Sequence, residues 1–119
     1  HKILDPNISV TATAVRVPVM GGHSESINLT LEKSFDINEV KELLAQSKGV
    51  ALEDDPENFK YPMPINARGK DEVFVGRIRE DFSCENSLNL WVVSDNLRKG
   101  AATNAIQILE TIISKGFIS

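Results

Sequence analysis

Two segments near the start of the chain alternate between apolar and polar residues with the period of a β-strand. Within 9–20 the apolar positions are Val10, Ala12 and Ala14 and then, after a shift of one residue, Val15, Val17 and Val19. This pattern predicts a strand with a bulge near its middle. Over 26–32, Ile27, Leu29 and Leu31 alternate with polar residues and predict a second, antiparallel strand. Gly21 and Gly22 permit a tight reversal between the two, so a hairpin is expected.

Later segments predict two helices and three further strands. Asp36 suits a helix N-cap, with Glu39 three residues later as in a capping box, and Gly49 ends that helix. Its expected apolar stripe is Ile37, Val40, Leu43 and Leu44. Strands are predicted at 50–52, 72–80 and 87–94, with a proline-rich irregular excursion at 54–70. The last helix is expected from residue 99 or 100 to 115, closed by Gly116.

The order β-β-α-β-β-β-α, joined by hairpins and long returns, predicts an α+β fold. We expect a mixed, mainly antiparallel sheet with helices packed on one face. The last helix carries alanine, isoleucine and leucine around more than a narrow stripe of its surface. It is therefore expected either to be the central helix of this domain or to pack against a domain outside this chain.

Composition narrows the possible functions. The 119 residues are one domain's worth, and a net charge of −4 does not favour binding to nucleic acid or to an anionic membrane. The apolar runs are too short to span a bilayer. One cysteine leaves no intrachain disulfide and fits the reducing cytoplasm. Because the chain begins at His1 without methionine, it is expected to be a piece of a longer protein.

Candidate chemistry gathers around the Gly21-Gly22 turn. Arg16 offers a fork of donors that suits a carboxylate or phosphate, and His23, seven residues later, can exchange protons near neutral pH. Together they describe an anion anchor and an acid/base without an obvious nucleophile. From spacing alone, a surface histidine and an arginine paired with Glu25 or Glu32 are the more ordinary interpretations.

Three blocks of sequence favour a functional interpretation of Arg16 and His23 over the ordinary one. They are Arg16-Val17-Pro18-Val19 with Gly22-His23-Ser24-Glu25, the block 69–79 (GKDEVFVGRIR), and the block 89–102 (NLWVVSDNLRKGAA). In this order and at these intervals they resemble the C-terminal region of aspartate-semialdehyde dehydrogenases, and the likeness covers essentially the whole chain. Two alternatives remain: a related N-acetyl-γ-glutamyl-phosphate reductase, or a non-enzymatic dimerisation module.

The resemblance implies a two-domain, dimeric enzyme of glyceraldehyde-3-phosphate-dehydrogenase-like architecture. Such an enzyme reversibly reduces β-aspartyl phosphate to aspartate semialdehyde with NADP, through a cysteine thioacyl intermediate. Its product feeds lysine, threonine, methionine and diaminopimelate synthesis. Residues 1–95 would be part of the dimerisation domain, and 96–119 a C-terminal helix that packs on the dinucleotide-binding domain.

The same resemblance assigns roles by position. His23 matches the acid/base histidine, Arg16 the arginine that holds the substrate carboxylate, and Asn96 an asparagine near the nicotinamide. The glycine-rich dinucleotide turn is absent from the chain, and Cys84 does not stand in the motif of the nucleophile. NADP is thus expected to bind mainly to the N-terminal domain, and these 119 residues alone are expected to be inactive.

Overall fold

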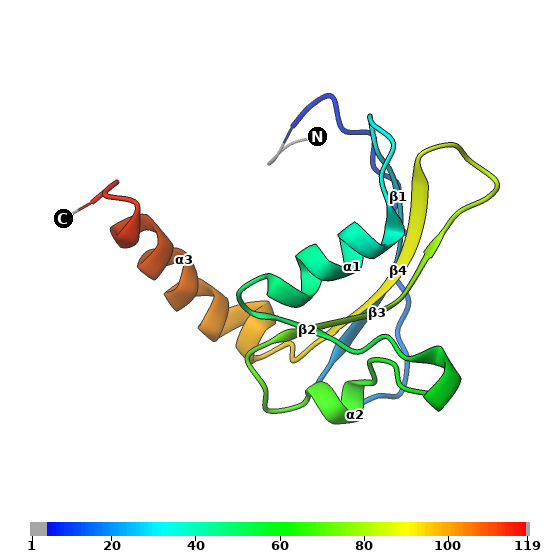
Figure 1. Ribbon diagram of the computed structural model, residues 1–119. Coiled ribbons are helices and arrows are strands. Elements are labelled where there is room, and N and C mark those ends of the chain that lie inside the picture. Colours follow the sequence, from blue (N-terminus) through cyan, green and yellow to red (C-terminus); the bar gives the residue numbers. More distant parts are fainter. Residues whose placement is uncertain (1–4, 119) are drawn as a thin grey trace.

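The computed structural model of the chain describes residues 5–118. Four strands and three α-helices, with one 3-10 turn and one π-helical turn, make up the fold (Figure 1). In chain order these are β1 (His23–Thr30), α1 (Ile37–Gln46), β2 (Val50–Leu52), η1 (Pro56–Asn58), α2 (Pro64–Ala67), β3 (Val73–Glu80), β4 (Ser87–Ser94), η2 (Arg98–Ala102) and α3 (Thr103–Ser114).

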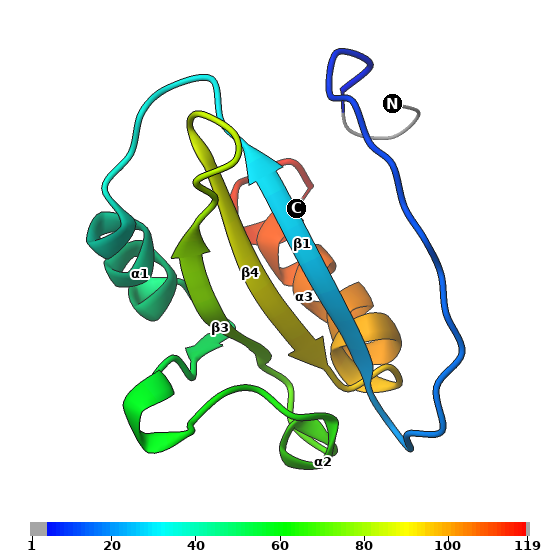
Figure 2. The same ribbon diagram turned by 90° about the vertical axis from the view of Figure 1, so that its right-hand side faces the viewer.

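The strands form one sheet in the order β1-β4-β3-β2 (Figure 2). β4 lies antiparallel to both β1 and β3, whereas β2 pairs in parallel with β3. The predicted α+β class with a mixed, mainly antiparallel sheet is therefore confirmed. β4 has the predicted bounds, Ser87–Ser94, and lies in the interior of the sheet, where it contacts a strand on each side.

Helix α1 covers one face of the sheet. Asp36 caps it as predicted, because the side-chain oxygen accepts hydrogen bonds from the amides of Asn38 and Glu39. The core beneath it contains Val75, Ile78 and Leu88, packed against the following residues of the helix and its approach: Phe35, Ile37, Val40 and Leu44. Leu43, expected in the same stripe, is instead 68% exposed. The apolar stripe of α1 is therefore narrower than predicted.

On the opposite face, the excursion between β2 and β3 closes over the sheet. Its short helix α2, which no sequence pattern had predicted, places Ala67 against Phe74 and Val93. The chain crosses so closely above Gly76 that a Cβ there would overlap the carbonyl oxygen of Glu53. Only glycine fits at this crossing.

Residues 9–20 do not form the predicted strand, and the predicted hairpin is absent. Here the segment is exposed and has no strand partner among the described residues; β1, which begins at His23, pairs with β4 instead. At Pro18 the backbone turns, because the amide of Val19 bonds to the carbonyl of Val17 at 2.9 Å. The alternating pattern therefore did not predict a strand correctly here, because a strand also needs a hydrogen-bonded partner.

The C-terminal helix leads away from the sheet (Figure 1). A π-helical turn, Arg98–Ala102, precedes α3, so the regular helix starts at Thr103, later than predicted. No residue of α3 is buried. Its large exposed apolar side chains are Ile106, Ile108, Leu109 and Ile113. The expected apolar surface on this helix is therefore present.

Two leucines test which side chains form the core. Leu88 is 2% exposed and Leu43 is 68% exposed. Leu88→Ala is expected to lower the free energy of unfolding by about 2–5 kcal/mol, because it removes buried methyl groups and leaves a cavity. Leu43→Ala is expected to change it by less than about 0.5 kcal/mol. Urea unfolding followed by Trp91 fluorescence measures both, and equal losses would contradict the assigned core.

Candidate functional site

His23 is the first residue of β1 and pairs with Ser94, the last residue of β4. Its side chain is exposed. The amino end of β3 lies at the same end of the sheet as His23 and Ser94, because Phe74 pairs with Val93. The loops at this end of the sheet are therefore 21–22, 68–72 and 95–98.

The buried carboxylate of Asp95 holds together two loops at this end of the sheet. Asp95, 5% exposed, accepts hydrogen bonds from the amides of Leu97 (2.8 Å) and Arg98 (3.0 Å) on one oxygen and of Gly69 (2.8 Å) on the other. These three bonds, that from Gly69 foremost, lower the pKa of Asp95 below the usual value for aspartate. Asp95 thereby joins the end of β4 to the loop before β3. Sequence reasoning missed this role.

Asn96, assigned to cofactor binding, follows directly. The residue is half-buried, and its side-chain oxygen is buried without a hydrogen-bond partner among residues 5–118. A buried acceptor of this kind is costly unless something bonds to it. An amide N–H of a bound group is a suitable partner.

The Gly21-Gly22 turn packs against α2 and the residue that follows it. Gly21 has a φ of +76°, and a Cβ on it would lie 3.2 Å from the Arg68 side chain. A Cβ on Gly22 would lie 3.1 Å from Pro64 Cβ of α2. The turn before His23 is therefore held against α2, and Arg68 adds a cation that the sequence motifs did not indicate.

Arg16 lies elsewhere on the exposed segment before that turn. It makes no hydrogen bond or ion pair with the residues that the structure describes. The structure thus brings His23 and Asn96 to one edge of the sheet, but it does not place Arg16 in contact with either.

A second carboxylate ties the start of β3 to the final helix. Asp71 accepts a hydrogen bond from the Thr103 hydroxyl at 2.8 Å and pairs with Arg98 at 3.0 Å. The Thr103 bond first, and then Arg98, lower the pKa of Asp71. Together with Asp95, this pair fixes how the π-helical turn leaves the edge that carries His23.

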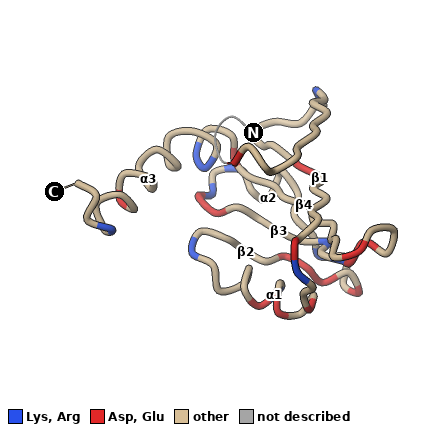
Figure 3. The backbone as a smooth tube through the Cα atoms, turned by 90° about the horizontal axis from the view of Figure 1, so that it is seen from above, with Lys and Arg blue, Asp and Glu red and all other residues tan. Residues whose placement is uncertain are grey.

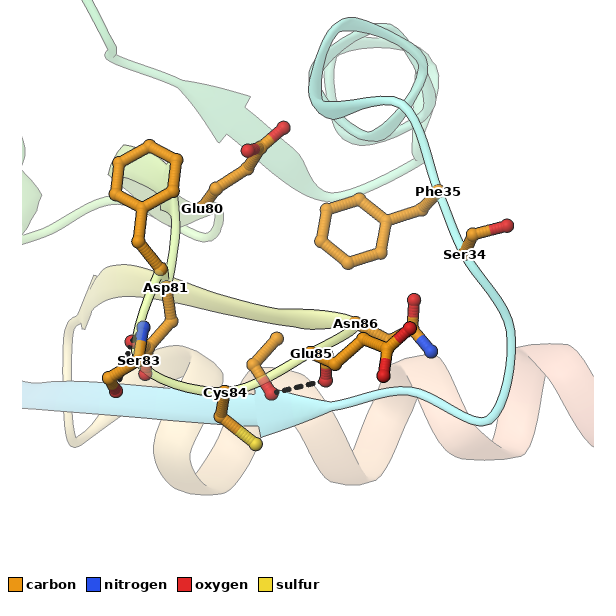
Figure 4. Close-up of a pocket in the computed structure, with 10 residues that line it drawn as sticks. Ser34, Phe35, Glu80, Asp81, Ser83, Cys84, Glu85 and Asn86 are labelled. Carbon is orange, nitrogen blue, oxygen red and sulfur yellow. Dashed lines mark hydrogen bonds between the residues drawn. The ribbon is translucent and has the colours of Figure 1, made fainter.

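A hollow lined by residues 34–35 and 80–87 lies at the other end of the strands (Figure 4). It has a volume of about 430 Å³ and lies between Phe35 and the β3–β4 hairpin. Its charged lining residues, Glu80, Asp81 and Glu85, are all acidic. It does not suit an anionic substrate.

Cys84 lies in that hairpin and is exposed. The Thr30 hydroxyl approaches its sulfur at 4.0 Å, so Cys84 sits beside the last residue of β1. An eight-residue strand is about 23 Å long, which separates Cys84 from His23. Cys84 is therefore not placed to exchange a proton with this histidine. Residues 5–118 also contain no group of three or more side chains that could hold a metal ion.

None of the helices described between residues 5 and 118 combines the length and apolar character needed to cross a membrane.

Comparison with known proteins identifies the family. Residues 1–99 match the family described as semialdehyde dehydrogenase, dimerisation domain. The chain belongs to this family. Among curated proteins it is 55% identical over 114 residues to an aspartate-semialdehyde dehydrogenase of Aquifex aeolicus, a match that covers 96% of this chain. It is 49% identical to that of Bacillus subtilis over 108 residues, 90% of this chain.

Solved structures agree with the family assignment. Aspartate semialdehyde dehydrogenase II of Vibrio cholerae, in complex with ASA, matches with a TM-score of 0.76 and 42% identity over 85% of this chain. The match covers 30% of that protein, and the two curated matches cover 34% and 31% of theirs. The chain therefore spans about a third of the length of these relatives.

Protonation of Asp95 is expected to destabilise the fold. A lowered pKa means that the stabilisation is present above the ordinary aspartate pKa near 4 and is lost as the pH falls through the folded-state value. Asp95→Asn, which turns an amide donor toward one of the three N–H groups, is expected to lower the urea midpoint at pH 7. The difference from wild type should shrink below about pH 4.

Glu42→Gln is the matched control, since Glu42 is an exposed α1 residue without a hydrogen bond or ion pair to the described residues. A constant difference between Asp95→Asn and wild type from pH 7 to pH 3 would contradict the role given to the carboxylate.

Proposed function

We propose that the protein to which this domain belongs is an NADP-dependent aspartate-semialdehyde dehydrogenase, which reversibly reduces β-aspartyl phosphate to aspartate semialdehyde. The observation that carries the proposal is the 55% identity, over 96% of the chain, to a relative of that name. The position of His23, at an edge held by Asp95, supports it. We propose that the enzyme acts in a reducing cytoplasm, in the synthesis of lysine, threonine, methionine and diaminopimelate.

His23 acts in this proposal as the acid/base. Pairing with Ser94 fixes its backbone, and the exposed imidazole is free to face a group outside residues 5–118. It takes the proton of the cysteine thiol, so that the thiolate can attack the acyl carbon and displace phosphate. The same imidazole then donates or accepts the proton of the acyl oxygen, depending on the direction of the reaction. The cysteine itself belongs to the part of the enzyme outside this chain.

Arg16 holds the α-carboxylate of the substrate in the proposal, since its guanidinium can donate two parallel hydrogen bonds. Its exposed position and lack of a partner among the described residues leave those donors available.

Asn96 fits the nicotinamide end of NADP, because its buried, unpartnered oxygen can accept a hydrogen bond from a carboxamide N–H. NADP, when bound, supplies or accepts the hydride. The rest of its binding site belongs to the dinucleotide-binding domain, against which we propose that residues 96–119 pack. The exposed isoleucines of α3 support that placement. The enzyme is proposed to be a homodimer or larger.

Substitution of His23 tests the reaction. In the full-length enzyme, His23→Ala is expected to lower kcat for NADP-dependent, phosphate-requiring oxidation of aspartate semialdehyde about 10²–10⁴-fold, the usual contribution of a general acid/base. Glu25→Gln, two residues along the same exposed strand, is the control and is expected to retain activity. An active enzyme indifferent to His23→Ala removes this residue from the mechanism, and an inactive wild type removes the proposed reaction.

Substitution of Arg16 tests the carboxylate contact. Lysine keeps the charge but cannot form the bidentate pair, so Arg16→Lys is expected to raise KM for aspartate semialdehyde about tenfold or more. KM for phosphate should stay within about twofold. The control is Arg79→Lys, at an exposed arginine that donates to the carbonyl of Arg77. Equal changes in the two KM values would contradict a contact with the carboxylate alone.

A further inference from the structure

The turn that follows β4 holds the backbone of Asn96 by bonds between the residues on either side of it. The carboxylate of Asp95 accepts hydrogen bonds from the amides of Leu97 and Arg98, the two residues directly after Asn96. The backbone carbonyl of Asp95 accepts a further bond from the amide of Gly100 at 3.0 Å. All three bonds bridge across Asn96, so they restrict the backbone conformation of this residue.

Asp95 itself is not placed to touch a ligand. The residue is 5% exposed, and its two oxygens already accept three backbone amides. Acidic and basic residues gather where α3 leaves the sheet (Figure 3), and the side chains of Asp71 and Arg98 there are 47% and 49% exposed. A cofactor that approaches this end of the sheet therefore meets those side chains and the half-buried Asn96 before it could reach Asp95.

An asparagine recognises a carboxamide only when its own amide is turned correctly. The oxygen accepts a hydrogen bond and the nitrogen donates two, so rotation of the side chain changes which group faces the ligand. In Asn96 the oxygen is buried without a hydrogen-bond partner among residues 5–118. Because backbone conformation limits the rotamers that a side chain can adopt, the bonds that fix the backbone of Asn96 also limit where this oxygen points.

We propose that Asp95 is a positioning residue for the nicotinamide end of NADP. Its carboxylate holds the turn in the conformation in which the side chain of Asn96 meets the carboxamide. The bonds from Leu97 and Arg98 serve this positioning, whereas the bond from Gly69 joins the turn to the loop before β3. The inference rests on the proposed use of NADP, and it adds the residue that presents Asn96 to the cofactor.

Substitution separates these two tasks of the carboxylate. Asp95→Asn keeps an oxygen for the amides of Leu97 and Arg98 but turns its NH₂ group toward Gly69. This variant is expected to bind NADPH within about threefold of wild type, although it is less stable. Asp95→Ala removes every acceptor and is expected to bind NADPH about tenfold more weakly, a loss comparable with that of one hydrogen bond. Fluorescence titration of the full-length enzyme with NADPH, without aspartate semialdehyde, measures both affinities.

A double substitution shows whether Asp95 acts through Asn96. Asn96→Ala is expected to weaken NADPH binding about tenfold. Addition of Asp95→Ala to Asn96→Ala is expected to weaken it by less than about threefold more, because residues that act as one unit are not additive. Asp81→Asn is the matched control. Its carboxylate also accepts a backbone amide, that of Ser83, but it follows β3 at the opposite end of the sheet, so NADPH affinity should equal that of wild type.

Three results overturn the proposal: Asp95→Asn that binds NADPH about tenfold more weakly than wild type, Asp95→Ala that binds it equally well, or a double variant weakened about 100-fold. If Asp95→Ala does not fold, Asp95→Val takes its place alone and in the double variant, because it fills more of the same space without an acceptor. A wild type that binds NADPH but does not oxidise aspartate semialdehyde contradicts the proposed reaction, while the affinities still decide the role of Asp95. A wild type that binds no NADPH overturns both.

Discussion

The carboxylate of Asp95 is the interaction on which the candidate site depends. It bonds to three backbone amides that come from two separate segments, one after β4 and one before β3. Those bonds set the direction in which the chain leaves β4, and therefore the position of Asn96 and of the π-helical turn after it. His23 reaches the same edge by pairing with Ser94, immediately before Asp95. Asp71, which bonds to Thr103 and pairs with Arg98, is the second carboxylate that holds the chain after β4 to the loop before β3.

Where structure depends on local interactions, it could be predicted from the sequence. The cap at Asp36 involves residues two and three positions away, and Gly116, with a left-handed φ of 71°, directly follows the C-cap Lys115 of α3. β4 was predicted at its full length because its apolar side chains face both sides of the sheet. Segment 9–20 has the same alternation but no partner within the described residues, and hydrogen-bonded pairing is what makes a strand.

The candidate site was predicted only in part, for a related reason. His23 and Asn96 were found because short motifs surround them. Asp95 lies inside one of those motifs, but its bond to Gly69 spans 26 residues, and no local pattern indicates it. Arg68 follows the unpredicted helix α2 and contacts Gly21 across 47 positions of sequence. Contacts of this range are set by the packing of the whole sheet.

The two faces of β1 call for different partners. Isoleucine and leucine on one face gain free energy from any apolar surface that excludes water. Hydroxyl and amide groups on the other face gain only when their hydrogen bonds are matched, which requires a partner of fixed geometry. The two faces of β1 therefore differ in the kind of surface that can cover them.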